Sequence, residues 1–232
     1  MAKKSKTRAK KRSAKRTRRV EREEDLSVLA IDSNYEPVTK AAFAYREQHV
    51  YPYLASKGLS LVRCQGLMAR RIYAAQEARR TDIIYITGVG HGSYTTYTGD
   101  HYDPIFSVGH YQPEESADKI VHFLSCQTAA QLGPDFVSHG CKAYFGYDEN
   151  FTFYMNYSDT FFECDSEIDL AFADGLTAEE VYDRAIALYN ERIADLELAG
   201  HDYVASVLEY DRDHLRAPSV DSRWGDRLAR IS

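Results

Sequence analysis

Long hydrophobic runs are missing from this chain of 232 residues. The most apolar stretches, such as 82–86, are far shorter than the roughly 20 residues that cross a bilayer as a helix, so we expect no membrane-spanning segment and no membrane partner. Proline is also scarce, with six residues, while 44% of the residues are hydrophobic. This is an ordinary globular composition, unusual only in its 18 tyrosines, and it favours one main domain.

Cysteine is scarce as well, and no two cysteines have the spacing of a CxxC pair. The four are Cys64, Cys126, Cys141 and Cys164. The missing ligand spacing argues against structural zinc. No apolar segment follows the charged N-terminus, so the sequence does not predict a secretory signal. We therefore expect reduced thiols and a cytoplasmic protein, which leaves at least one cysteine to be explained in another way.

Acidic residues are nearly absent from the first 22 positions. This segment has 12 Lys or Arg and one acid, Glu21, a net charge of +11, which leaves 17 basic and 34 acidic residues, a net of −17, for residues 23–232. Burial cannot offset the cost of ordering such a segment, so we expect residues 1–24 to form a disordered basic tail. Three roles stay open: a solubilising tail, a contact of residues 1–22 with nucleic acid, or a segment held by the acidic body.

Strands and helices alternate through the rest of the chain. Continuous apolar strands suggest burial on both faces of a sheet, and the alternation predicts an α/β fold with a mostly parallel sheet flanked by helices. The predicted strands are 26–32, 59–64, 83–87, 120–126 and 141–147, and the predicted helices are 38–57, 67–80 and 129–139. A loop of about 25 residues is expected before the fourth strand.

A helical region follows this alternation. Thr177 and Glu180 have the spacing of a capping box and open a predicted helix that runs to about Leu198. From Asp211 onward charge dominates, and we expect a loosely held C-terminus. The sequence thus predicts an α/β core over 25–165 and a C-terminal helical part over 166–232 that packs on it.

Two reactive side chains follow successive predicted strands. His91 comes after the third strand, between two glycines, and Cys126 ends the fourth. Each has a commoner structural explanation when taken alone, as a loop histidine or a small buried side chain. If the strands are neighbours, however, their carboxyl ends lie side by side, where ligand sites form in open α/β sheets. The ordered pair therefore favours a Cys–His catalytic dyad.

The chemistry of such a dyad gives roles to the residues beside His91 and Cys126. The imidazole takes the thiol proton and later protonates the leaving amine. The amides of Gly92 and Cys126 are candidate donors to an oxyanion. If a helix begins directly after Cys126, its N-terminus would stabilise the thiolate further.

These segments resemble a known family. Residues 84–92 (IYITGVGHG) and 121–129 (VHFLSCQTA) are similar to the two catalytic strands of caspase-like cysteine peptidases, in particular the prokaryotic CHAT, gingipain and clostripain type. The resemblance covers about residues 26–165. It implies a three-layer caspase-like fold, a cysteine endopeptidase with His91 as general base and acid and Cys126 as nucleophile, and Gly92 as an oxyanion donor. It implies no cofactor, a protein or peptide substrate, and room for an activating partner protein.

One position departs from the family pattern. Clostripain-like members often have an acidic residue two positions before the nucleophile, where it selects a basic substrate side chain, and this chain has Leu124. Asp148 and Glu149, just after the fifth strand, are the remaining candidates for acidic walls of the substrate pocket. With an acidic cleft, the basic tail would become a candidate pseudosubstrate or self-cleavage segment.

Other functions compete with the peptidase. The main alternative is a catalytically idle caspase-like scaffold whose basic tail binds nucleic acid or an acidic partner, and a further one is an α/β binding module outside the family. Several histidines and aspartates combine into a metal site only on paper, because no pair has helical ligand spacing, so we expect no metal. They are His101, His110, His122, His139, Asp100 and Asp103.

Overall fold

The computed structural model describes residues 26–231, and in this range the chain forms a six-stranded sheet in the order β2-β1-β3-β7-β8-β9. Neighbouring strands pair in parallel except β8 and β9, which are antiparallel. The strands are β1 (Ser27–Asp32), β2 (Ser60–Gln65), β3 (Ile83–Val89), β7 (Ile120–Leu124), β8 (Ala143–Tyr147) and β9 (Leu215–Arg216). The predicted α/β class with a mostly parallel sheet is confirmed. The predicted basic tail, residues 1–24, lies outside the described residues.

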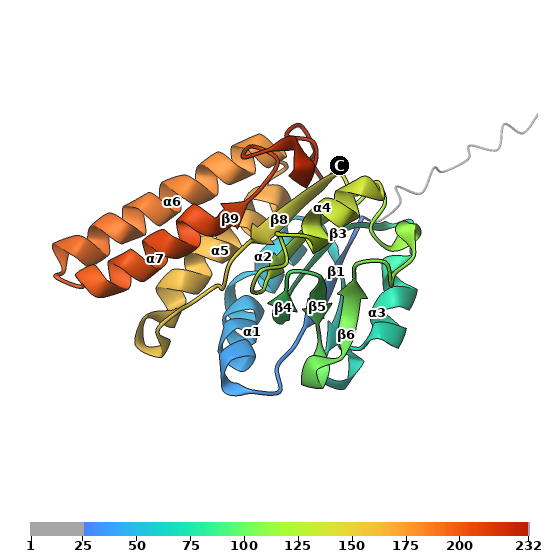
Figure 1. The fold of residues 1–232 in the computed structure, drawn as a ribbon, viewed down its shortest axis with the longest axis horizontal. Helices are drawn as coiled ribbons and strands as arrows, with labels where there is room; N and C mark the ends of the chain where they lie inside the picture. The colour runs from blue at the N-terminus through green and yellow to red at the C-terminus, as the bar shows by residue number, and fades with distance from the viewer. Residues whose placement is uncertain (1–25, 232) are drawn as a thin grey trace, which may run out of the picture.

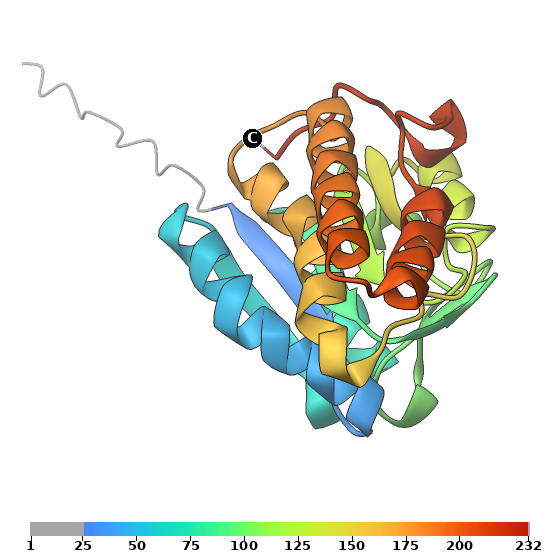
Figure 2. The same ribbon diagram turned by 90° about the vertical axis from the view of Figure 1, so that its left-hand side faces the viewer.

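Helices flank the sheet on both faces (Figures 1 and 2). Helices α1, α2 and α5 pack on one face and α3 and α4 on the other, while α6 and α7 form a pair that packs on α5. The helices are α1 (Pro37–His49), α2 (Tyr51–Ser56), α3 (Arg71–Ala78), α4 (Leu132–Ser138), α5 (Ser158–Ala173), α6 (Ala178–Leu198) and α7 (Asp202–His214). None of these helices, within 26–231, is long and apolar enough to cross a membrane.

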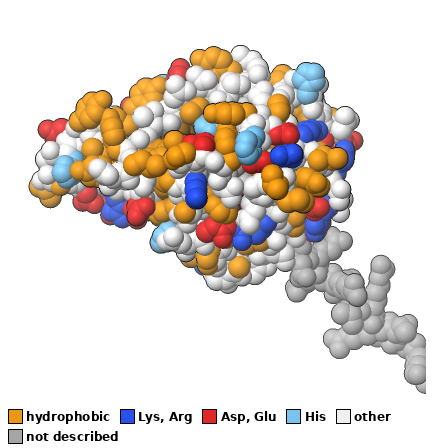
Figure 3. Space-filling view, turned by 90° about the horizontal axis from the view of Figure 1, so that it is seen from below, with side chains coloured by type: hydrophobic (Ala, Val, Ile, Leu, Met, Phe, Trp, Pro, Cys, Tyr) orange, Lys and Arg blue, Asp and Glu red, His pale blue; other side chains and the backbone are white. Residues whose placement is uncertain are grey.

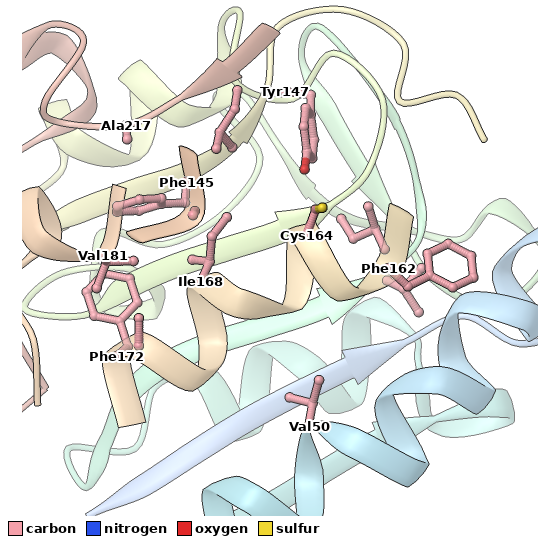
Figure 4. Close-up of a cluster of buried hydrophobic side chains, with 14 of the residues drawn as sticks. Val50, Phe145, Tyr147, Phe162, Cys164, Ile168, Phe172, Val181 and Ala217 are labelled. Atoms are coloured by element: carbon pink, nitrogen blue, oxygen red, sulfur yellow. The ribbon is translucent and has the colours of Figure 1, made fainter. Parts of the chain in front are cut away.

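Burial on both faces follows from the alternation of side chains along the strands. In β1, Val28 and Ala30 belong to the core beneath α1 and α5, whereas Leu29 and Ile31 belong to the core on the opposite face. Figure 4 shows part of the first core, where aromatic and aliphatic side chains of β8, α5 and α6 lie together. A strand buried on both sides must be apolar throughout, which is why its sequence shows no polar alternation.

The prediction of a long loop before the fourth strand is wrong. Its residues form a second, antiparallel sheet of three short strands, in the order β4-β5-β6. Short strands with threonine, glycine and tyrosine lack the apolar run by which the other strands were recognised. Their bounds are β4 (His91–Ser93), β5 (Thr96–Thr98) and β6 (Pro104–Ser107). The buried Tyr97 ties this sheet to the main one by donating a hydrogen bond to the carbonyl of Ile31, at 2.7 Å.

Two further expectations need correction. The helix predicted over 38–57 is two helices, because α1 ends at His49 and α2 restarts with Pro52 in its first turn, where proline needs no amide hydrogen. The C-terminal segment is not loosely held: Trp224, Ala229 and Ile231 are buried, and the Trp224 indole donates to the carbonyl of Ala129. The capping box of Thr177 and Glu180 is confirmed at the start of α6.

Helix α5, which the sequence analysis missed, runs across the predicted boundary between residues 165 and 166. Nine of its residues are buried. It contacts α1, α2, β7 and α6, so it lies between the sheet and the outer helical pair. The remaining short 3-10 helices are η1 (Gly66–Met68), η2 (Asp100–Tyr102), η3 (Pro113–Glu115), η4 (Met155–Tyr157) and η5 (Ser222–Trp224).

A buried network of charged side chains joins α1, the sheet and α5. The fully buried Arg46 donates from Nη1 to Asp169 Oδ2 at 2.9 Å and from Nη2 to Thr87 Oγ1 at 2.7 Å. Its Nε donates to the hydroxyl of Tyr51, which donates in turn to Asp32. Burial alone would raise the pKa of Asp169, but Arg46 and His122 hold it well below its ordinary value, so Asp169 is the ionised partner.

His122 extends this network across the sheet. The ring lies between two buried carboxylates, with Nε2 3.2 Å from Asp165 Oδ1 and Nδ1 3.3 Å from Asp169 Oδ2. Burial alone would lower the pKa of His122, but the two carboxylates raise it to about 9. The imidazole is therefore charged at neutral pH and offsets the second carboxylate.

Replacing Arg46 by Met should lower the free energy of unfolding by roughly 3–5 kcal/mol, because removing one partner leaves a buried carboxylate without its counter-charge. The matched control is Arg80→Met, which removes exposed ion pairs with Glu77 and Asp82 and should cost no more than about 1 kcal/mol. Urea denaturation of both variants measures the difference. Equal losses would contradict a structural role for the buried pair.

The charge of His122 should make stability depend on pH. Because the pKa rises on folding from 6.5 to about 9, the stabilisation is complete below pH 6.5 and is lost as the pH rises through 9. The loss over this window should approach roughly 3 kcal/mol. Urea denaturation at several pH values should show this decline in the native protein and a flatter profile in His122→Gln. Parallel profiles would count against a charged His122.

Candidate active site

The pairing of β3 with β7 brings the predicted site residues to one edge of the sheet. The two strands are parallel neighbours whose register sets Val89 opposite Leu124, and the last ladder hydrogen bond runs from Gly90 N to Leu124 O, at 3.2 Å. His91 and Cys126 each lie two residues beyond this last pair. The spacing of 35 positions between them thus equals the register offset of the two strands.

Gly92 lies directly against the backbone of Cys126. A Cβ atom on this glycine would lie 2.1 Å from the carbonyl oxygen of Cys126 and 2.8 Å from Cγ2 of Thr128, so no other residue fits without displacing that segment. Among residues 26–231, no backbone carbonyl accepts a hydrogen bond from the Cys126 amide. The two predicted oxyanion donors therefore belong to adjacent backbone segments at the end of the ladder.

The thiol of Cys126 is partly buried and protonated. Its Sγ donates to the carbonyl of Phe151 at 3.8 Å, and burial raises the pKa of the thiol above its ordinary value. The expected help from a helix N-terminus is absent, because α4 begins only at Leu132, after a turn in which Gln127 has a φ of 63°. That turn is fixed to the segment after β8 by a hydrogen bond from Gln127 N to Glu149 O, at 2.9 Å.

His91 is held from two sides. Its Nε2 lies 3.4 Å from Oε1 of Glu36, and its ring stacks on Tyr102 with the centroids 4.8 Å apart. Glu36 is the N-cap of α1 and accepts hydrogen bonds from the amides of Val38 and Thr39, at 2.8 and 2.7 Å. Burial alone would raise its pKa, but these amides hold the pKa of Glu36 below its ordinary value. A fixed carboxylate thus faces the imidazole.

The segment carrying Tyr102 has an unusual backbone. His101 and Tyr102 have φ values of 50° and 60°, a region that side chains other than glycine rarely occupy. The buried Asp100 stabilises the turn in three ways: an ion pair with Arg70, a contact of 2.9 Å between its Oδ1 and His101 Nδ1, and its amide, which donates to the carbonyl of Ala69. Backbone strain of this kind is typical of functional sites.

His91 and Cys126 line the same cavity. It holds about 360 Å³ of empty space, counting its open mouth, and the remaining walls come mainly from α1, the strand ends, the segment 151–153 and α5. A thiol and an imidazole that line one cavity are the groups that acyl transfer through a cysteine would use.

The two predicted substrate-binding acids are not in this cavity. Asp148 accepts from Arg216 Nε at 2.6 Å, and its Oδ1 is 2.9 Å from His214 Nδ1, so its charge is already paired with the C-terminal segment. Glu149 contributes its carbonyl to the turn after Cys126, as described above. Neither residue lines the cavity.

Three supporting residues escaped the sequence analysis. Glu36 is far from His91 along the chain, Tyr102 lies in the segment that the sequence analysis took for a loop, and no motif marks either residue. The third, Asp211 of α7, accepts from the amide of Thr152 at 3.0 Å and so fixes the segment 151–153. Burial raises the pKa of Asp211 well above its ordinary value. The only sequence signal for Glu36 is its place just before Pro37, since a side-chain acceptor followed by proline often begins a helix.

Within the part of the chain that the structure describes, no three His, Cys, Asp or Glu side chains are grouped so as to hold a metal ion. No model of a known protein family matches the sequence, and comparison with curated proteins finds no match either.

The raised pKa of Cys126 predicts how the thiol reacts. Because only the thiolate is alkylated, modification by iodoacetamide should be slow at neutral pH and accelerate as the pH rises above the ordinary thiol range. Peptide mapping by mass spectrometry should show Cys126 modified before the buried Cys64 and Cys141, whose pKa values are raised to about 11 and 12. A rate that is already maximal below pH 7 would indicate a preformed thiolate–imidazolium pair instead.

Proposed function

We propose that this protein is a cysteine endopeptidase of the caspase-like type, which cleaves protein or peptide substrates through a dyad of Cys126 and His91. The observation that carries the proposal is the register of β3 and β7: His91 and Cys126 follow the paired strand ends at equal distance and line one cavity. The close packing of Gly92 on Cys126 supports it, because a general scaffold has no need to hold these two backbone segments in contact.

The reaction begins from the protonated thiol. Since Nε2 of His91 faces Glu36, the other ring nitrogen, Nδ1, is the one left to take the Sγ proton. Sγ then attacks the substrate carbonyl carbon, and the oxyanion accepts hydrogen bonds from the amides of Gly92 and Cys126. His91 returns the proton to the leaving nitrogen as the C–N bond breaks, which leaves a thioester on Cys126.

Water completes the cycle. His91 takes a proton from a water molecule whose oxygen attacks the thioester, and the thiol of Cys126 leaves with that proton as the carboxylic acid product forms. Glu36 and Tyr102 act as positioning residues: the carboxylate stabilises the imidazolium that forms twice in the cycle, and the stacked ring restricts its rotation.

An activity-based peptide probe with an acyloxymethyl ketone tests the dyad. It should label the native protein at Cys126, and Cys126→Ala should abolish labelling. His91→Ala should lower the labelling rate by at least about 100-fold, because the thiol loses its base. Glu36→Gln should cause a smaller loss, since it removes only the charge that faces the ring.

The matched control is His49→Ala, an exposed histidine at the opposite end of α1 from Glu36, which should label at the native rate. Absence of labelling at Cys126 in the native protein, or equal rates in the two histidine variants, would refute the dyad. The idle scaffold would then be the better account of the fold.

A further inference from the structure

We propose that the cavity beside Cys126 is the pocket for the substrate side chain that precedes the cleaved bond, and that it selects an uncharged apolar side chain such as that of Leu or Phe. This inference rests on the proposed peptidase function and adds the substrate class. It departs from the sequence analysis, in which acidic walls were the candidate feature of this pocket.

The walls of the cavity are apolar. Val38 and Ala42 of α1 form one side, and Val89 and Leu124 lie at the paired strand ends. The rest of the apolar lining comes from the rings of Phe151, Phe153 and Phe162. The aromatic walls support one another: Phe153 packs edge-on against Phe162 with centroids 4.7 Å apart, and Phe151 lies 6.3 Å from Phe153. Such packing keeps the rings in place, so the pocket exists before a substrate arrives.

Of the Asp, Glu, Lys and Arg side chains in residues 26–231, none lines the cavity. The remaining polar side chains are those of Thr39, Ser125, His91 and Cys126, and Ser125 Oγ is already 2.8 Å from Oγ1 of Thr128. A charged substrate side chain would lose its hydration here without gaining a counter-charge, whereas an apolar one would gain from leaving water.

The acidic residues at the protein surface do not change the uncharged, apolar character of the cavity. On the face seen in Figure 3, acidic side chains lie scattered among hydrophobic and basic ones. Asp148, one of the two acids that the sequence analysis offered as a pocket wall, is paired with Arg216 and His214. The charge of −17 on residues 23–232 therefore gives no acidic pocket at Cys126.

The inference bears on the basic tail. Residues 1–22 offer only Met1 and Val20 as large apolar side chains, among 12 Lys or Arg. Cleavage after the basic residues of the tail would place a charge in the apolar pocket. The tail is thus a poor substrate for this site, and its role lies in one of the other functions that its charge allows.

Peptide acyloxymethyl ketones that differ only in this one side chain test the proposal. The Phe or Leu probe should inactivate Cys126 roughly 10- to 100-fold faster than the Arg or Asp probe, with the modified residue identified by mass spectrometry.

Val38→Asp should raise the rate at which the Arg probe labels Cys126, because it adds a carboxylate to the wall of the cavity at a position where Val38 is 46% exposed. An acid in the first turn of α1 is compatible with the helix dipole, so the variant should fold.

Val38→Asn is the control of equal size, and it should leave the Arg probe slow. If the Arg or Asp probe labels Cys126 of the native protein fastest, the apolar pocket is refuted, while the proposed peptidase function is not. Cleavage after Lys or Arg in the tail of the native protein, absent from Cys126→Ala, would overturn it in the same way. If no probe labels Cys126, the proposed peptidase function is refuted, and the assignment of the pocket is refuted together with it.

Discussion

The ion pair between Arg46 and Asp169 is the contact on which the rest of this structure depends. It is fully buried and joins α1 to α5 on one face of the sheet, over the central strand β3, whose Thr87 bonds to both partners. Arg46 also reaches Asp32 through Tyr51, and Asp32 accepts from the amide of Val89. A buried charge left without its partner costs far more than an exposed one, so this network admits few arrangements of α1, β3 and α5. Glu36 caps α1, His91 follows β3 by two residues, and Phe162 belongs to α5.

The candidate site takes its geometry from that arrangement. His91 follows the end of β3, Cys126 follows the end of β7, and Glu36 is the N-cap of α1. The outer helices contribute indirectly, since Asp211 of α7 fixes the amide of Thr152 between two of the aromatic walls. The C-terminal helices are thus part of the support of the candidate site, although its Cys and His follow the carboxyl ends of β3 and β7.

The protonated thiol and the apolar cavity are consistent with each other. Both follow from burial: the same walls that exclude charge from the cavity raise the pKa of Cys126. In the proposed reaction His91 therefore acts as a base when the substrate binds, and the carboxylate of Glu36 stabilises the resulting imidazolium. The acidic residues of the body are largely paired elsewhere, as Glu163 is with Arg192 and Asp174 with Arg184.

The sequence by itself determined the main strands, their alternation with helices and the pair His91 and Cys126, because apolar runs and strand-end positions are local signals. It missed the strands β4, β5 and β6 and helix α5, since short polar strands and a helix containing acids that are neutralised by distant partners carry no such signal. Only the tertiary structure decided that Glu36 and Tyr102 hold His91, that Asp148 is paired with Arg216, and that three phenylalanines line the cavity. Each of these contacts joins residues from different elements of the fold, and local sequence patterns do not record which elements the fold brings together.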